Sequence, residues 1–350
     1  MQIRSHSHPY TVVEYGTLDA ALAPPDGSGS TFYLVDQKIA DLYGPQLVAA
    51  APPERIHRIV ASETAKSYEQ LGPIFCWLLD GGCRRTSQLV VVGGGVLQDI
   101  GCFIASVLFR GIRWTLLPTT LLAQCDSCIG SKSSLNIHRF KNQLGTFYPP
   151  HEVRLAFEFL KTLSHEEILS GLGEAIKLHL IDGPESVKRL RAKLAAPPSE
   201  IPLHDIVRDS LRIKKRFIEE DEFDRGVRNL LNYGHTFAHA LESATRYEIP
   251  HGIAVTVGLA CATYFSERLG KVTAGSYDDL LAWLRPYFGN YVESVRRVDL
   301  TAVVGAMKQD KKNRGDEITF ILTRGPGQME KAGLSAHEAL KLLADCRETL

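Results

Sequence analysis

Three histidines with metal-ligand chemistry, His235, His239 and His251, are concentrated in residues 232–251, and the carboxylate of Glu242 lies among them. The first two histidines are four apart, so on a helix their side chains share one face. His251 follows a predicted loop, and a second helix could bring it back to the same place. Neutral imidazole is a common zinc ligand, and catalytic zinc usually takes three protein ligands and keeps one position open. Satisfied core histidines are the alternative, but three so close together favour a metal site.

A glycine run could bind phosphate. Gly93, Gly94 and Gly95 follow an apolar strand and precede a predicted helix, so backbone N–H groups there could approach an anion. The run lacks the G-x-G-x-x-G spacing, and a simple tight turn is an equal alternative. Asp36 ends another predicted strand, where an acidic side chain could bind a ribose hydroxyl or cap the next helix.

The segment 118–150 is rich in polar side chains that lie between apolar stretches. They are Asp126, Lys132, Asn136, Lys141 and Asn142. A solvated loop would not need the apolar residues around it, whereas buried lysine and aspartate need partners. This pattern favours an active-site wall over a surface loop.

Glu174 and Lys177 are three apart in a predicted helix, where they could form part of a site or an ordinary surface ion pair. The basic segments 214–216 and 225–228 flank the acidic run 219–222. Taken alone, these charged segments indicate solvated faces.

Composition excludes several classes of protein. Among the 350 residues, 40 are Lys or Arg and 40 are Asp or Glu, so the net charge indicates neither nucleic acid nor membrane as a partner. We find no apolar stretch long enough to span a bilayer, and the polar N-terminus lacks the apolar core of a signal peptide. The seven scattered cysteines suit reduced thiols in the cytoplasm. Cys125 and Cys128 match C-x-x-C, but without a second pair we do not favour a zinc or redox role.

The pattern of apolar residues predicts an α/β part followed by a mostly α-helical part. Apolar runs without alternation at 32–35, 88–92 and 114–117 predict strands of a parallel sheet covered on both faces, with a helix at 39–47. From about residue 155 helical periodicity dominates, apart from one plausible strand at 318–322. We therefore expect two domains, 1–155 and 156–350.

Several motifs, in this order, resemble the dehydroquinate synthase family over roughly residues 30 to 325. They are Gly93-Gly-Gly-Val-x-x-Asp99, Arg110-Gly111, Pro118-Thr-Thr-Leu-Leu-Ala-Gln-x-Asp126, Lys132-x-x-x-Asn136, Lys141-Asn142, Gly173-Glu174-x-Ile-Lys177, Leu231-Asn-x-Gly-His235-Thr-x-x-His239, His251-Gly-x-Ala-Val255 and Met307-x-x-Asp310-Lys-Lys312. The resemblance implies a homodimeric sugar-phosphate cyclase that depends on NAD and a divalent metal. It also implies a Rossmann-like NAD-binding domain at 1–155 and an α-helical metal- and substrate-binding domain at 156–350.

The resemblance also implies residue roles. The metal, usually zinc and otherwise cobalt, would be held by Glu174, His235 and His251, so His239 would instead face the substrate. The residues implied at NAD are Asp36, Glu63, Lys66, Gly93, Gly94, Gly95, Asp99, Thr119, Thr120, Asp126, Lys132 and Lys141. The residues implied at the substrate are Asp126, Lys132, Asn142, Lys177, Lys214, Arg228, Asn232, His239, Arg110 of a neighbouring subunit, and Lys311. We choose Lys311 over Lys312 because it is four after Met307.

The resemblance implies elimination of phosphate and closure of a carbocycle, with 3-deoxy-D-arabino-heptulosonate 7-phosphate giving 3-dehydroquinate. Five departures from the family pattern leave other substrates open: Gln98, Ser131, the step Ser133-Ser134, Ala238, and Ile253 in place of an acidic residue. The alternatives are sedoheptulose 7-phosphate giving 2-epi-5-epi-valiolone, and glucose 6-phosphate giving 2-deoxy-scyllo-inosose. A metal-dependent alcohol or glycerol-phosphate dehydrogenase is disfavoured, because Leu178 stands where its next histidine ligand belongs.

Overall fold

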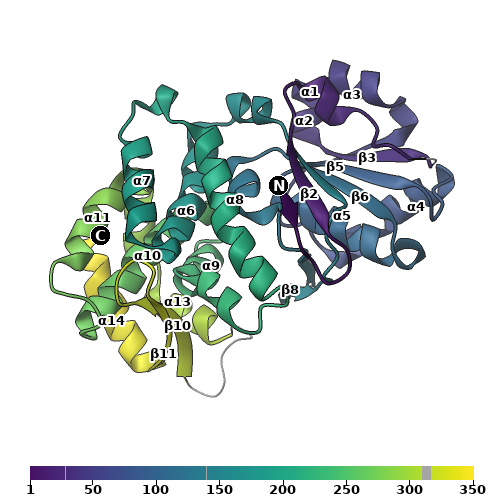
Figure 1. Cartoon of the computed structure of the whole chain (residues 1–350). Coiled ribbons are helices and arrows are strands. Elements are labelled where there is room, and N and C mark those ends of the chain that lie inside the picture. Colours follow the sequence, from purple (N-terminus) through teal and green to yellow (C-terminus); the bar gives the residue numbers. More distant parts are fainter. Residues whose placement is uncertain (28, 139, 310–316) are drawn as a thin grey trace. The chain divides into compact units, whose positions relative to one another are not determined.

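The computed structural model describes residues 1–27, 29–138, 140–309 and 317–350. These form two compact units (Figure 1). The sheet unit contains Met1–Leu163 and Lys214–Phe223, and the helical unit contains Ser164–Ile213 and Asp224–Leu350. No helix among the described residues is both long and apolar enough to cross a membrane.

The described part of the sheet unit contains a seven-stranded sheet in the order β1-β2-β9-β6-β5-β3-β4. Neighbouring strands are parallel except for the antiparallel pair β1–β2. The strands are β1 (Gln2–Ile3), β2 (Tyr10–Glu14), β3 (Thr31–Asp36), β4 (Ile56–Ile59), β5 (Gln88–Gly93), β6 (Arg113–Pro118) and β9 (Glu152–Leu155). The strands expected at 32–35, 88–92 and 114–117 are therefore confirmed as β3, β5 and β6.

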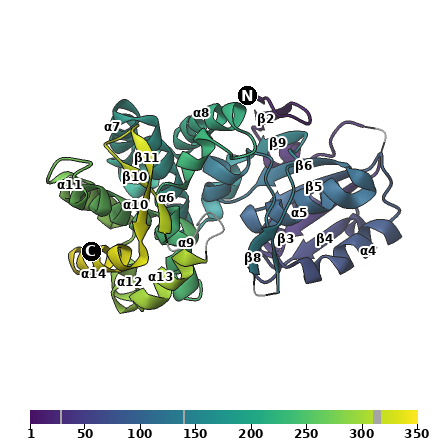
Figure 2. The same ribbon diagram turned by 90° about the horizontal axis from the view of Figure 1, so that it is seen from below.

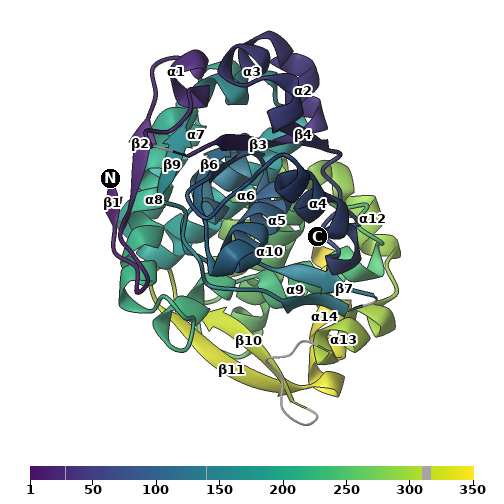
Figure 3. The same cartoon turned by 90° about the vertical axis from the view of Figure 1, so that its right-hand side faces the viewer.

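Helices cover both faces of this sheet, which explains the unbroken apolar runs. Side chains of α1 (Leu18–Leu22), α2 (Gln37–Leu42) and α3 (Gly44–Ala50) share one buried core with Tyr33, Val35, Val90 and Val92. On the opposite face, Gly101 of α5 (Gly95–Val107) lies so close to Val91 that an added Cβ would be 2.3 Å from a valine methyl. Figure 3 shows α2 and α5 on opposite sides of the strands.

The single helix expected at 39–47 is instead two helices, α2 and α3, that meet at Tyr43. The cause is Pro45, which follows Gly44 and lies in the first turn of α3. Proline has no N–H to continue the bonding of α2, although it fits well in the first turn of a new helix.

The helical unit packs around a long buried helix, α10 (Figure 2). Its main helices are α6 (His165–Asp182), α7 (Pro184–Leu194), α8 (Leu203–Glu220, which continues into the sheet unit), α9 (His235–Ala244), α10 (His251–Arg268), α11 (Ser276–Leu284), α12 (Val292–Arg297), α13 (Leu300–Lys308) and α14 (Ala336–Thr349). The strand expected at 318–322 is β10 (Glu317–Thr323), and it pairs with β11 (Met329–Ser335). The sequence did not predict β11, because only one of its seven residues is buried and its apolar residues are few.

Helices α6 and α10 approach one another closely at two glycines. A Cβ added to Gly173 would lie 2.0 Å from the carbonyl oxygen of Gly252, and one added to Gly252 would lie 1.7 Å from that of Ser170. Both distances are far below van der Waals contact, so no side chain fits at either position. This contact brings Glu174, next to Gly173, close to His251, next to Gly252.

Candidate metal centre and cofactor-binding residues

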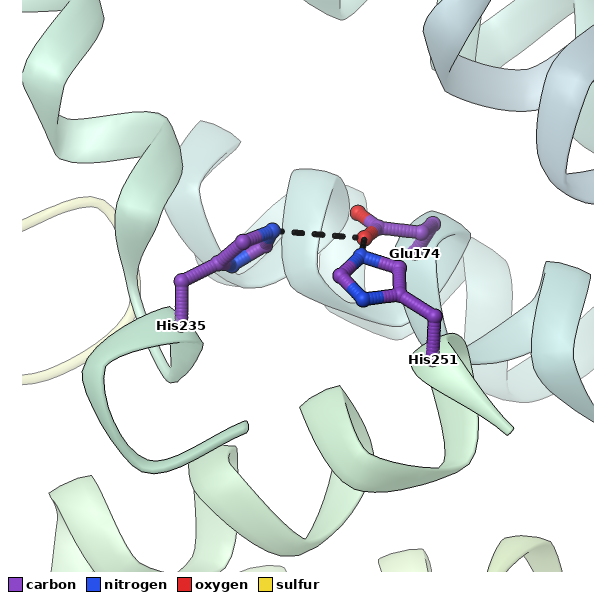
Figure 4. Close-up of side chains that lie close together, drawn as sticks. All are labelled: Glu174, His235 and His251. Carbon is purple, nitrogen blue, oxygen red and sulfur yellow. Dashed lines mark hydrogen bonds and ion pairs between the residues drawn. The ribbon is translucent and has the colours of Figure 1, made fainter. Parts of the chain in front are cut away.

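Glu174, His235 and His251 converge in the helical unit (Figure 4). Glu174 lies within α6, whereas His235 and His251 are the first residues of α9 and α10. The Oε1 atom of Glu174 is 3.4 Å from Nε2 of His235 and 3.1 Å from Nε2 of His251. One ligand atom from each residue lies within 4.8 Å of the other two. One carboxylate and two imidazoles are a donor set that zinc accepts.

The charges around the cluster also suit a divalent cation. Burial alone would raise the pKa of Glu174, but Lys177 and His235 hold it well below its usual range, so the carboxylate is ionised. Burial and the Lys177 charge lower the pKa of His235, which keeps that imidazole neutral. Burial opposes charge on His251, yet Glu242 and Glu174 raise its pKa to about 10. A cation would replace this His251 proton, since metal ligands must be deprotonated.

Lys177 and Glu174 form a fully buried pair, with Nζ 2.5 Å from Oε2 and side chains only 2% and 1% exposed, respectively. The interpretation as a surface ion pair is therefore wrong. The spacing placed both residues on one helix face, but only the packing of α6 against α10 buries that face.

His239 lies beside the cluster but is not one of its three residues, Glu174, His235 and His251. Its ring is 5.2 Å from the ring of His235 and 5.8 Å from that of His251, centroid to centroid. The expectation that residues 235 and 239 share a helix face is confirmed. His239, Glu242 and His251 also form a second group of potential ligand atoms within 4.8 Å of one another.

Two other expected substrate residues lie on the short 3-10 helix η7 (Val227–Asn232), directly before α9. Arg228 is buried, and Asn232 is half-buried and donates a hydrogen bond to the carbonyl of Asn229. Lys311 lies outside the described residues.

In the sheet unit, a buried lysine connects the expected cofactor residues. Lys66 Nζ is 3.1 Å from Asp99, 3.6 Å from Glu63, and 3.0 Å from the side-chain oxygen of Asn142. Glu63 also lies 3.3 Å from Lys141. Burial raises the pKa of Asp99 to about 6 even though Lys66 opposes the shift. One network thus joins three chain segments.

The glycine run and the two threonines meet at the carboxyl edge of the sheet. Gly93 pairs with Pro118 across β5 and β6, and the N–H of Thr119 donates to Gly93 O at 3.1 Å. A Cβ added to Gly94 would lie 3.0 Å from the methyl group of Thr120. In parallel α/β sheets, ligands bind at this edge. Asp36 ends β3 at the same edge and accepts a hydrogen bond from the N–H of Lys38, so it caps α2 in this structure.

Asp126 and Lys214 are paired, with Nζ 2.7 Å from Oδ1. Lys132 is half-buried, and its backbone forms an isolated antiparallel β-bridge with Phe147.

Arg110 is exposed, on a turn where Phe109 and Arg110 have left-handed φ angles of 53° and 64°. Such backbone strain in non-glycine residues is uncommon and concentrates at functional positions.

Two of the departures from the family pattern have new partners that the sequence did not reveal. Gln98 donates to the carbonyl of Ser127 at 2.5 Å and accepts from its hydroxyl at 2.8 Å. Ser131 has a left-handed φ of 59°, and its hydroxyl donates to Glu222 at 2.8 Å. Neither contact could be predicted, because the partners are 29 and 91 residues away along the chain.

Comparison with known proteins identifies the family. The model of the 3-dehydroquinate synthase N-terminal domain matches residues 56–170, and that of its C-terminal domain matches residues 171–313. The 3-dehydroquinate synthase of Alkaliphilus metalliredigens (strain QYMF) is 33% identical over 322 residues, which cover 91% of this chain and 90% of that protein. The chain therefore belongs to the 3-dehydroquinate synthase family, a family of phosphate-eliminating cyclases, as the sequence motifs predicted.

Solved structures confirm the expected fold. A 2-deoxy-scyllo-inosose synthase complexed with carbaglucose-6-phosphate, NAD⁺ and Co²⁺ superposes with a TM-score of 0.84 at 21% identity, covering 99% of each chain. The 2-epi-5-epi-valiolone synthase of Streptomyces hygroscopicus subsp. jinggangensis 5008, with NAD⁺ and Zn²⁺ bound, gives 0.80 at 24% identity, covering 97% of each. Both are sugar-phosphate cyclases with this Rossmann-like and α-helical architecture.

Proposed function

We propose that this protein is an NAD- and divalent-metal-dependent cyclase that converts 3-deoxy-D-arabino-heptulosonate 7-phosphate to 3-dehydroquinate with release of phosphate. The observation that carries the proposal is the convergence of Glu174, His235 and His251 in a chain of this family. These three residues would hold Zn²⁺ or Co²⁺, which would polarise a substrate oxygen, while NAD would accept and return a hydride.

The chain's own residues would bind and orient the ligands. In the sheet unit, proposed as the NAD-binding domain, the N–H groups at Gly94 and Gly95 would bind the pyrophosphate at the start of α5. The Lys66 network would hold the surrounding segments in place. The further NAD contacts that we propose are Asp36, Glu63, Gly93, Asp99, Thr119, Thr120, Asp126, Lys132 and Lys141.

The proposed substrate contacts are rich in basic groups, which suits an anionic sugar phosphate. Buried Arg228 would bind a carboxylate through two parallel hydrogen bonds. The other contacts that we propose are Asp126, Lys132, Asn142, Lys177, Lys214, Asn232, His239 and Lys311. Retention of Lys214, Arg228 and Asn232 supports a substrate that carries a carboxylate.

A second substrate class is supported by Gln98 and Ser131, whose side chains form hydrogen bonds that glycine could not. Sedoheptulose 7-phosphate and glucose 6-phosphate are the candidates. A dehydrogenase has less support. Leu178 is fully buried and cannot bind a metal. The Nδ1 of the neighbouring His179 lies 3.1 Å from the carbonyl oxygen and 2.8 Å from the hydroxyl oxygen of Ser186 instead.

We also propose a cytoplasmic homodimer. The exposed position of Arg110 on a strained turn suits a side chain that reaches into the substrate site of a second copy. The seven cysteines are free thiols and six are buried, which suits a reducing compartment.

The decisive experiment measures phosphate release from the three sugar phosphates in the presence of NAD and Zn²⁺ or Co²⁺. We expect release from the heptulosonate phosphate without net NADH accumulation, because the hydride returns to the substrate. Release from another sugar phosphate alone would overturn the substrate assignment but not the reaction class. Net NADH formation from a simple alcohol would overturn both.

A further inference from the structure

We propose that Glu242 is a positioning residue for the metal centre: its carboxylate accepts the Nδ1–H of His251 and so turns the Nε2 lone pair of that imidazole toward the cation. The inference deepens the proposed function and rests on its metal site. It concerns a residue outside the ligand set, one that the motif spacing first suggested as a ligand.

The argument begins with the two nitrogens of His251. Nδ1 lies 3.1 Å from Oε2 of Glu242, and Nε2 lies 3.1 Å from Oε1 of Glu174. A neutral imidazole carries one N–H, and the other nitrogen is then free to bind a metal. An ionised carboxylate accepts hydrogen bonds and cannot donate one. Without a cation, each nitrogen faces a carboxylate and the protonated ring donates to both. With a cation held by Glu174 and Nε2, one N–H would remain, and Glu242 would keep it on Nδ1.

The position of Glu242 explains how it can serve the centre without entering it. It lies on α9 seven residues after His235, hence two helical turns away and on the same face. One helix thus supplies both a ligand and the support for a second ligand. The Glu242 side chain is 14% exposed, so its bond to His251 is largely shielded from water.

The helix that carries His251 offers its ring no acidic partner in the first turn. Two positions after His251, α10 has the fully buried Ile253, which has no hydrogen-bond acceptor in its side chain. The carboxylate at Nδ1 of His251 comes from the neighbouring helix α9.

The same atoms allow one competing arrangement, in which His239, Glu242 and His251 hold a cation of their own. His251 Nδ1 would then be a ligand and would carry no proton. The two arrangements differ in the number of cations per chain and in the tautomer of His251, and both quantities can be measured.

The test compares Glu242→Ala and Glu242→Gln with the native chain. Dissociation constants for Zn²⁺ and Co²⁺ are measured by competition with a chromophoric chelator, and the ¹⁵N shifts of His251 in the zinc-loaded protein report its tautomer. We expect Glu242→Ala to bind about 10 to 100 times more weakly, as is typical when a carboxylate supporting a histidine ligand is lost. Glu242→Gln should be intermediate, because its amide oxygen still accepts the Nδ1–H. The matched control is Glu248→Gln, an exposed carboxylate that accepts from Ser294, and it should bind as the native chain does.

Equal affinity of Glu242→Ala and the native chain for Zn²⁺ would overturn the inference. So would the finding that the native chain binds two cations and Glu242→Ala only one, because Glu242 would then be a ligand. A protonated Nε2 in the zinc-loaded protein would also overturn it. If the native chain holds no cation and Glu174→Ala behaves identically, the metal site of the proposed function fails as well. If Glu174→Ala loses the cation but Glu242→Ala does not, only the role of Glu242 fails.

Discussion

Lys214 and Asp126, which are 88 residues apart in the chain, form an ion pair inside the sheet unit. The Lys214 ammonium is 2.7 Å from the carboxylate and donates a second hydrogen bond, also 2.7 Å long, to the carbonyl of Asp126. Their side chains are 8% and 15% exposed. Both are proposed substrate contacts, and in this structure their opposite charges compensate one another.

Lys214→Ala should destabilise the protein by about 3 to 5 kcal/mol, because it removes the ammonium that lies 2.7 Å from the largely buried Asp126 carboxylate. Urea unfolding measures the change, and the control is Arg212→Ala, a 71% exposed residue on the same helix that should cost less than about 1 kcal/mol. Asp126→Asn should reduce the cost of losing Lys214. Strictly additive effects in the double variant would show that the pair contributes nothing.

Glu174→Gln should abolish retention of a divalent cation, because a neutral amide replaces the anionic ligand while keeping its shape. Elemental analysis after dialysis measures the metal content per chain. Glu185→Gln on α7, an exposed carboxylate outside the cluster, should retain the native content. A full complement of metal in Glu174→Gln would refute the ligand assignment.

Gly173→Ala should force α6 away from α10, since its Cβ would lie 2.0 Å from the carbonyl of Gly252. We expect a loss of about 1 to 3 kcal/mol or more in unfolding free energy, together with weaker cation binding as Glu174 moves from His251. Gly305→Ala is the control, because its Cβ would meet nothing within 4 Å and it lies within α13. That change should stabilise by about 0.5 to 1 kcal/mol. Equal behaviour of the two variants would contradict the packing argument.

Ser131→Ala should destabilise by about 1.5 to 3 kcal/mol, because it removes a hydrogen bond to the Glu222 carboxylate and keeps the left-handed backbone. Ser131→Gly should lose the same bond but regain about 1 kcal/mol, since glycine adopts φ of 59° without strain. Thermal and urea unfolding give the order native, then Gly, then Ala. A glycine variant less stable than the alanine variant would exclude this explanation.

Stability should fall as the pH drops from about 6.5 towards 4, in part through His151. Burial, and after it His8 and Arg113, lowers the pKa of His151 from 6.5 to about 4. The unfolded chain therefore takes up a proton in this range before the folded chain does, and the contribution is complete only above pH 6.5. Because the ring is partly exposed, we expect about 1 kcal/mol. Urea unfolding at pH 7.5, 5.5 and 4.5 should show a shallower decline for His151→Gln than for His138→Gln, whose side chain is 79% exposed. Parallel curves would rule out the contribution.

The sequence by itself determined four of the strands, β3, β5, β6 and β10, and the general position of the candidate metal centre. Unbroken apolar runs can only be buried on both faces, so β3, β5 and β6 followed from pattern alone. The spacing of His235 and His239 placed two imidazoles on one helix face, because helical periodicity is a local property. The family motifs added Glu174, which lies too far along the chain for any spacing argument to reach.

Only the tertiary structure decided how these groups are used. The burial of Glu174 and Lys177 depends on the contact of two glycines on α6 and α10, which no local pattern contains. Likewise, the bonds of Gln98 and Ser131 and the bond from Glu242 to His251 join separate elements of the fold. Hydrogen bonds and ion pairs act over about 3 to 4 Å, so residues distant in sequence acquire partners only when the chain is folded.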